Sequence, residues 1–132
     1  MFSPNVLRDK IILVTGGGTG IGREMCEKFA SLGAKIAIVG RRTEILDKAV
    51  ADLRNLGYDA FSTRCDIRSP EEITVAVDRI IDHYGRIDVL INNAAFQIHS
   101  AEFEDLTDAH FDTTLKTNLY GYFQWRRRLC PT

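Results

Sequence analysis

The sequence predicts an α/β fold in which helices cover both faces of a parallel β-sheet. One observation is that short apolar runs of strand length alternate along the chain with amphipathic stretches of helix length. A second is that a glycine-rich turn joins the first apolar run to the first amphipathic stretch. Because strand–helix–strand units form right-handed crossovers between parallel strands, this alternation favours a doubly wound sheet.

Four strands are predicted from short runs in which apolar, aromatic or β-branched residues recur. They are residues 10–15 (KIILVT), 35–39 (KIAIV), 59–64 (DAFSTR) and 87–92 (IDVLIN). No apolar run in the chain approaches the roughly 18 residues that a bilayer-spanning helix needs, so we expect no membrane segment.

The first two helices are predicted at residues 20–32 and 43–56. Each has apolar residues three or four positions apart, which places them on one face of the helix. These residues are Ile21, Met25, Phe29 and Leu32 in the first helix, and Leu46, Val50, Leu53 and Leu56 in the second. Gly33 and Gly57 follow, and glycine is favoured just after a helix end.

The predicted third helix begins at the sequence Ser-Pro-Glu-Glu. Ser69 is suited to cap the helix, Pro70 fits its first turn, and Glu72 is placed to complete a capping box. The residues expected to face inward, ahead of a stop at Gly85, are Ile73, Val77, Ile80 and Ile81. A fourth helix is predicted from about residue 107, through Asn118, to about residue 125.

The composition argues against several classes of function. The chain has 17 basic and 18 acidic residues and a formal net charge of -1. It therefore has no excess of positive charge that would attract nucleic acid. The cysteines and histidines are too widely spaced for a disulfide framework or a metal site. They are Cys26, Cys65, Cys130, His83, His99 and His110. Because the first ten residues also show no secretory signal, we expect reduced thiols and a cytoplasmic location, with the lumen of an organelle as the alternative.

The glycine-rich turn is LVTGGGTGIGRE, residues 13–24. Five of its seven residues from position 16 to position 22 are glycine. Glycine lets the backbone turn sharply and approach a pyrophosphate, whose charge then meets the free N–H groups of a helix N-terminus. A tight turn without a ligand is the alternative, and the strand–turn–helix context favours the phosphate site.

The spacing of this turn, Thr-Gly-x-x-x-Gly-x-Gly, resembles the phosphate loop of the short-chain dehydrogenase/reductase family. Further segments match that family in its order. They are Gly-Arg-Arg at 40–42, Cys-Asp-Ile at 65–67, Asn-Asn-Ala-Ala at 92–95 and Lys-Thr-Asn-Leu at 116–119. The resemblance spans residues 8 to about 124 and implies a Rossmann-type doubly wound sheet, truncated after the fourth strand and the fourth helix.

The resemblance also implies roles for individual residues. The expected phosphate-loop contacts are Thr15, Gly16, Gly18, Thr19, Gly20, Ile21 and Gly22. Asp66 would accept a hydrogen bond from the adenine amine, and the backbone of Ile67 would donate to a ring nitrogen. The residues expected beside the ribose and nicotinamide are Asn92, Ala94 and Ala95, the last of which stands where the family usually has glycine. Asn118 matches the asparagine of the family's active-site tetrad.

Two arginines follow the second predicted strand. An NAD-preferring site needs a carboxylate at this place to accept from the ribose hydroxyls, and the chain has none there. Arg41 and Arg42 instead offer permanently charged, planar donors that suit a phosphate. We therefore expect NADP(H) to be preferred over NAD(H), with a solvated loop as the alternative interpretation.

The family's remaining catalytic groups, a serine and a Tyr-x-x-x-Lys pair, lie beyond the matched segment. Tyr120 and Tyr122 are followed four positions later by Gln124 and Arg126, where lysine would be required. The final residues, WRRRLCPT at 125–132, do not continue the helical pattern. We interpret 1–124 as an incomplete NAD(P)-binding domain and 125–132 as an aberrant tail, produced either by a shifted reading frame or by a genuinely short protein.

The expected function is that of the cofactor-binding portion of an oxidoreductase. In intact form it would transfer hydride between NADP(H) and a small-molecule carbonyl/alcohol or enoyl thioester, and it would form a homo-oligomer. The motifs look closest to dienoyl-CoA reductase-like and 3-ketoacyl reductase-like members. The alternative is a non-catalytic nucleotide-binding fragment, or an interaction subunit that pairs through its open sheet edge.

Overall fold

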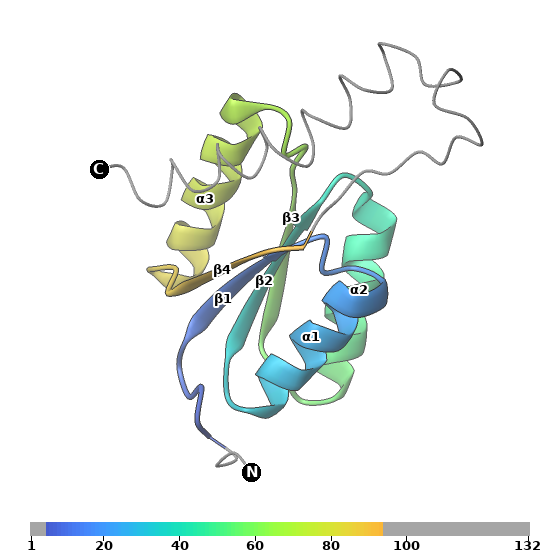
Figure 1. The fold of residues 1–132 in the computed structure, drawn as a ribbon, viewed down its shortest axis with the longest axis vertical. Helices are drawn as coiled ribbons and strands as arrows, with labels where there is room; N and C mark the ends of the chain where they lie inside the picture. Colours follow the sequence, from blue (N-terminus) through green and yellow to red (C-terminus); the bar gives the residue numbers. More distant parts are fainter. Residues whose placement is uncertain (1–4, 94–132) are drawn as a thin grey trace, which may run out of the picture.

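The computed structural model describes residues 5–93, in which strands and helices alternate (Figure 1). In chain order the elements are β1 Ile11–Thr15, α1 Gly20–Ser31, β2 Lys35–Gly40, α2 Thr43–Asn55, β3 Ala60–Arg64, α3 Pro70–Tyr84 and β4 Val89–Asn92. Every predicted bound within this range lies within two residues of the observed one. The predicted fourth helix and the tail lie outside the described residues. No helix within residues 5–93 is long and apolar enough to cross a membrane.

The four strands form one parallel sheet in the order β3-β2-β1-β4. Thr15, the last residue of β1, pairs with Val39 of β2 and with Asn92 of β4. The carboxyl ends of these three strands therefore lie side by side. The chain crosses from β3 at one end of this order to β4 at the other, and the point where strand order reverses is where open α/β sheets bind ligands.

Helices cover both faces of the sheet, as the sequence predicts. Figure 1 shows α1 and α2 on one face and α3 on the other. Successive residues of β1 face opposite sides: Val14 packs in the core beneath α1 and α2, while Leu13 packs in the core beneath α3. The core on the α3 side is completed by Ile73, Ala76, Val77 and Ile80. The doubly wound parallel sheet is therefore confirmed.

The inward face of α1 differs from the predicted one. Its buried residues are Gly22, Cys26 and Ala30, whereas Ile21 is 72% exposed. The small side chains let the helix lie close to the sheet, which a stripe of large apolar residues would not allow. Periodicity alone favoured the larger residues, so the predicted face was displaced by one position.

Two other predicted core positions are also wrong. Leu56 is 54% exposed because it is the C-cap residue of α2, beyond the last helical turn. Ile81 is 39% exposed because it follows the buried Ile80 by about 100° around α3. Ala49 and Ala76 take the inward positions instead.

The predicted helix ends are largely confirmed. Gly33, Gly57 and Gly85 have positive φ angles of 102°, 88° and 89°, a conformation that favours glycine. Ser69 caps α3 by accepting from the N–H of Glu72 at 3.3 Å. The other half of the predicted capping box is wrong, because the Ser69 N–H donates to the Asp66 carbonyl and the Glu72 carboxylate turns toward Arg64 instead.

Candidate nucleotide-binding site

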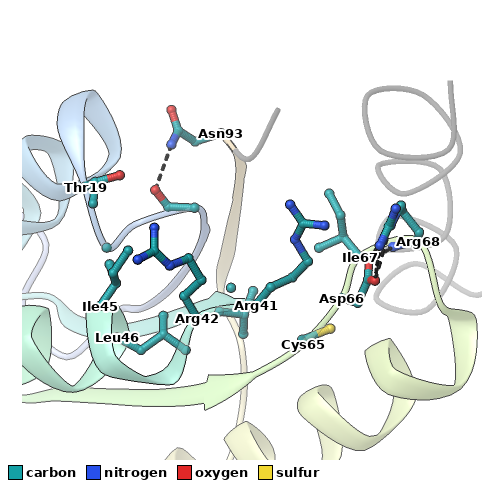
Figure 2. Close-up of a pocket in the computed structure, with 14 residues that line it drawn as sticks. Thr19, Arg41, Arg42, Ile45, Leu46, Cys65, Asp66, Ile67, Arg68 and Asn93 are labelled. Atoms are coloured by element: carbon teal, nitrogen blue, oxygen red, sulfur yellow. Dashed lines mark hydrogen bonds and ion pairs between the residues drawn. The ribbon is translucent and has the colours of Figure 1, made fainter. Parts of the chain in front are cut away.

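A cleft of about 410 Å³ lies at the carboxyl ends of β1, β2 and β3 (Figure 2). Its lining residues come from the end of β2, from the turns that follow the three strands, from the first turn of α2 and from the residue after β4. They are Gly16, Gly18, Thr19, Val39, Gly40, Arg41, Arg42, Ile45, Leu46, Cys65, Asp66, Ile67, Arg68 and Asn93. Three segments that the sequence singled out, after β1, β2 and β3, therefore meet around one cavity.

Seven of the predicted cofactor contacts line this cleft. They are Gly16, Gly18, Thr19, Arg41, Arg42, Asp66 and Ile67. Thr15, Gly20, Ile21, Gly22 and Asn92 lie nearby in sequence but do not line it. Ala94, Ala95 and Asn118 lie outside the described residues. Among the lining residues that sequence reasoning missed, Arg68 and Asn93 have polar side chains.

The turn between β1 and α1 presents backbone to the cleft. Gly16 and Gly20 have φ angles of 68° and 57°, which favour glycine. A Cβ on Gly18 would lie only 2.7 Å from the side chain of Ile45, so a larger residue there would force this side chain of the cleft lining to shift. Within the described residues, the N–H groups of residues 18–21 make no hydrogen bond, and they stand at the N-terminus of α1. This arrangement suits a phosphate.

Thr15 and Asn93 tie this turn to β4. The Thr15 hydroxyl is fully buried, accepts from the N–H of Asn93 at 3.0 Å and donates to the Ile91 carbonyl at 3.4 Å. The Asn93 amide donates to the Gly16 carbonyl at 3.1 Å. A Cβ on Gly22 would overlap the Asn93 amide nitrogen and the Gly16 carbonyl oxygen. Thr15 and Gly22 therefore hold the turn in place from behind the cleft.

Arg41 and Arg42 differ in their surroundings. Figure 2 shows the two side chains diverging from the end of β2, Arg42 toward Thr19 and Ile45 and Arg41 toward the turn that holds Asp66 and Arg68. The Nε of Arg42 donates to the Glu44 carboxylate at 3.0 Å, and both side chains are largely exposed. Arg41 forms no hydrogen bond or ion pair with any other residue of the described part. Arg41 is thus the cation that can meet a ligand without breaking an existing contact.

The turn after β3 contains a close ion pair. Asp66 accepts from the backbone N–H of Arg68 at 3.0 Å and from its guanidinium at 2.7 Å. These guanidinium hydrogen bonds are the main cause that lowers the pKa of Asp66 below its ordinary value. The signal that could have found Arg68 is its position two residues after an acid in a short turn.

Ile67 offers a backbone donor at the same turn. Its side chain is 5% exposed and packs in the core beneath α3. Its N–H makes no hydrogen bond within the described part of the chain. A ring nitrogen of a base held in the cleft could accept from this group.

Cys65 also lines the cleft, but its thiol is not suited to nucleophilic chemistry. The residue is fully buried, and burial raises its pKa to about 12. The same cause raises the pKa of Cys26 to about 12. Both thiols are therefore neutral near pH 7. Among residues 5–93, no group of three or more His, Cys, Asp or Glu could hold a metal ion.

Comparison with known proteins identifies the family. Residues 10–132 match the family model for short chain dehydrogenases. One curated relative, the peroxisomal 2,4-dienoyl-CoA reductase of Arabidopsis thaliana, is 42% identical over 122 residues, which cover 92% of this chain and 41% of the relative.

Solved structures agree with this match. The actinorhodin polyketide ketoreductase with NADPH, in a variant form, is 32% identical with a TM-score of 0.86, over 91% of this chain and 46% of that one. An NAD⁺-bound xylitol dehydrogenase is 34% identical with a TM-score of 0.89, over 94% of this chain and 48% of that one. The chain thus spans less than half the length of each of these proteins. It belongs to the short-chain dehydrogenase/reductase family.

Proposed function

We propose that the cleft binds NADP(H) in preference to NAD(H), and that the intact enzyme transfers hydride between this cofactor and a carbonyl/alcohol or an enoyl thioester. This proposal rests on the charge of the described lining residues. Three of them are arginines and one is an acid, Asp66, which is paired with Arg68. A 2′-phosphate would meet cations here, whereas a ribose diol would find no unpaired carboxylate among the described residues of the lining.

The shape of the site supports a dinucleotide. The N–H groups of residues 18–21, which have no hydrogen-bond partner within residues 5–93, suit the pyrophosphate, and glycine at position 18 avoids a collision with Ile45. The N–H of Ile67, likewise without a partner in that range, suits the adenine ring. Arg41 and Arg42 would hold the 2′-phosphate. The bound nicotinamide would supply the hydride chemistry, and the residues described here would bind and orient its adenosine half.

The relatives inform the choice of cofactor and substrate. One solved relative contains NADPH and another NAD⁺, so family membership leaves the cofactor open and the argument rests on the arginines. The 42% identical relative is named for 2,4-dienoyl-CoA reduction, which favours an unsaturated acyl thioester as the first substrate to test. That relative is peroxisomal, and a cytoplasmic location and homo-oligomeric assembly stay predictions for this chain.

Titration of the chain with NADPH and NADH tests the cofactor proposal. We expect NADPH to bind at least tenfold more tightly at low ionic strength, because hydrogen bonds to charged groups contribute about 1.5–3 kcal/mol each. Equal affinities would contradict it. Oxidation of NADPH with 2,4-dienoyl and 3-ketoacyl thioesters then tests the activity, and binding without oxidation would favour a non-catalytic nucleotide-binding chain.

A further inference from the structure

The three arginines of the cleft differ in whether they contact an acid directly. Arg42 pairs with Glu44 at 3.0 Å, and Arg68 pairs with Asp66 at 2.7 Å. In both pairs the acid lies two residues from the arginine. Arg41 has no such partner among the described residues. The 2′-phosphate proposed above would therefore meet two different arginines. Arg41 makes no hydrogen bond or ion pair within the described part and acts on Asp66 only at longer range, whereas Arg42 is already hydrogen-bonded to an acid.

Glu44 is well placed to influence that phosphate. It lies in the first turn of α2, directly beside the cleft-lining residue Ile45, and its carboxylate accepts from the Nε of Arg42. The two Nη groups of Arg42 stay available to a ligand. The Glu44 pKa is lowered by a hydrogen bond from its own backbone N–H and then by the one from Arg42, so the carboxylate is ionised near neutrality.

We propose that Glu44 is a specificity-determining residue that weakens the preference of this cleft for a 2′-phosphorylated nucleotide by compensating the charge of Arg42. This inference rests on the proposed NADP(H) function. It assigns the two adjacent arginines unequal parts: Arg41 carries most of the interaction with the phosphate, and Arg42 contributes less because Glu44 competes for it. When the 2′ position is a hydroxyl, the Arg42–Glu44 pair stays intact and does not change the affinity of the ligand.

The test compares adenosine 2′,5′-bisphosphate with 5′-AMP as ligands of the chain. Both probes occupy only the adenosine half of the site, which the described residues form, and they differ only in the 2′-phosphate. Glu44→Gln keeps an oxygen that accepts from Arg42 but removes the negative charge. We expect it to tighten adenosine 2′,5′-bisphosphate about two- to fivefold and to leave 5′-AMP unchanged, in line with the modest strength of exposed ion pairs.

Two further variants decide the mechanism. Asp47→Asn removes an equal charge from an exposed position of the same helix that lines no part of the cleft, and we expect no change in the affinity of either probe. In an Arg42→Ala background, Glu44→Gln should have no effect, because the residue whose charge Glu44 compensates is gone. A thermal melt of each variant confirms that the fold is retained.

Separate outcomes would overturn the inference and the function on which it rests. If Glu44→Gln leaves the bisphosphate affinity unchanged or weakens it, Glu44 orients Arg42 instead of opposing the phosphate. If the gain persists in the Arg42→Ala background, it does not pass through Arg42. If the unaltered chain binds both probes equally, the 2′-phosphate site itself is absent, and the NADP(H) proposal fails with it.

Discussion

The turn between β1 and α1 lines the cleft with backbone, whereas the turns after β2 and β3 line it with charged side chains. In the first region glycine is required for steric or conformational reasons. A side chain at position 18 would collide with Ile45, and Gly16 has a positive φ angle. In the second region Arg42 and Arg68 are exposed or half-buried and each is paired with an acid, whereas Arg41 has no ion pair within residues 5–93. The first region thus tolerates almost no change, while the second can be tuned residue by residue.

The largest effect should come from adding a methyl group at Gly22. The new Cβ of Gly22→Ala would overlap the Asn93 amide and the Gly16 carbonyl, so the link between the first turn and β4 must shift. We expect a loss of about 1–3 kcal/mol in the free energy of unfolding and loss of both NADPH and NADH binding. Chemical denaturation and ligand titration measure the two effects.

Gly40→Ala is the matched control for that substitution. Gly40 also lines the cleft, but its Cβ would meet only the Leu46 side chain, at 3.4 Å, which is ordinary van der Waals contact. The free energy of unfolding of the Gly40→Ala variant should differ from that of the unaltered chain by less than about 0.5 kcal/mol, as expected for a substitution without a steric conflict. Equal destabilisation by the two variants would show that steric overlap does not distinguish these glycines.

A second prediction concerns the buried hydroxyl of Thr15. Thr15→Val removes the acceptor of the Asn93 N–H and the donor to Ile91 while keeping the shape of the side chain. We expect a loss of about 1 kcal/mol in the free energy of unfolding, because two hydrogen bonds of the buried hydroxyl are lost while the Asn93 N–H keeps the Ile91 carbonyl as a second acceptor. Thr15→Ser keeps the hydroxyl and should lose less. If the serine and valine variants unfold at the same denaturant concentration, the hydrogen bonds contribute little.

The two regions also differ in how well the sequence predicts them. Glycine spacing, helix stops and strand runs are local signals, so the described strands and helices, the doubly wound order and the position of the phosphate loop could all be predicted. The exposure of Ile21 could not, because it depends on how closely α1 lies against the sheet. The pairing of Arg68 with Asp66, and of Arg42 with Glu44, was also missed, since a sequence gives residue types but not which donors are already occupied.

A third prediction separates the two adjacent arginines. Arg41→Ala should weaken NADPH binding by about ten- to a hundredfold, because it removes charged hydrogen bonds that contribute about 1.5–3 kcal/mol. Arg42→Ala should weaken it only a few-fold, since Glu44 already compensates part of that charge. NADH affinity should change little in either variant. Isothermal titration at two salt concentrations measures this, and equal losses for the two variants would contradict the assigned difference.

The smallest expected effect is a pH dependence from the Asp66–Arg68 pair. The hydrogen bonds from Arg68 lower the folded-state pKa of Asp66, so the pair stabilises the fold above the unfolded-state pKa of about 4. This contribution is lost as pH falls from that value through the lower folded-state pKa. Arg68→Ala removes it, so the unaltered chain should exceed the variant in stability by less than about 1 kcal/mol at pH 7. The difference should shrink in denaturation curves recorded toward pH 2, and a difference independent of pH would show that Arg68 acts by packing rather than through the Asp66 carboxylate.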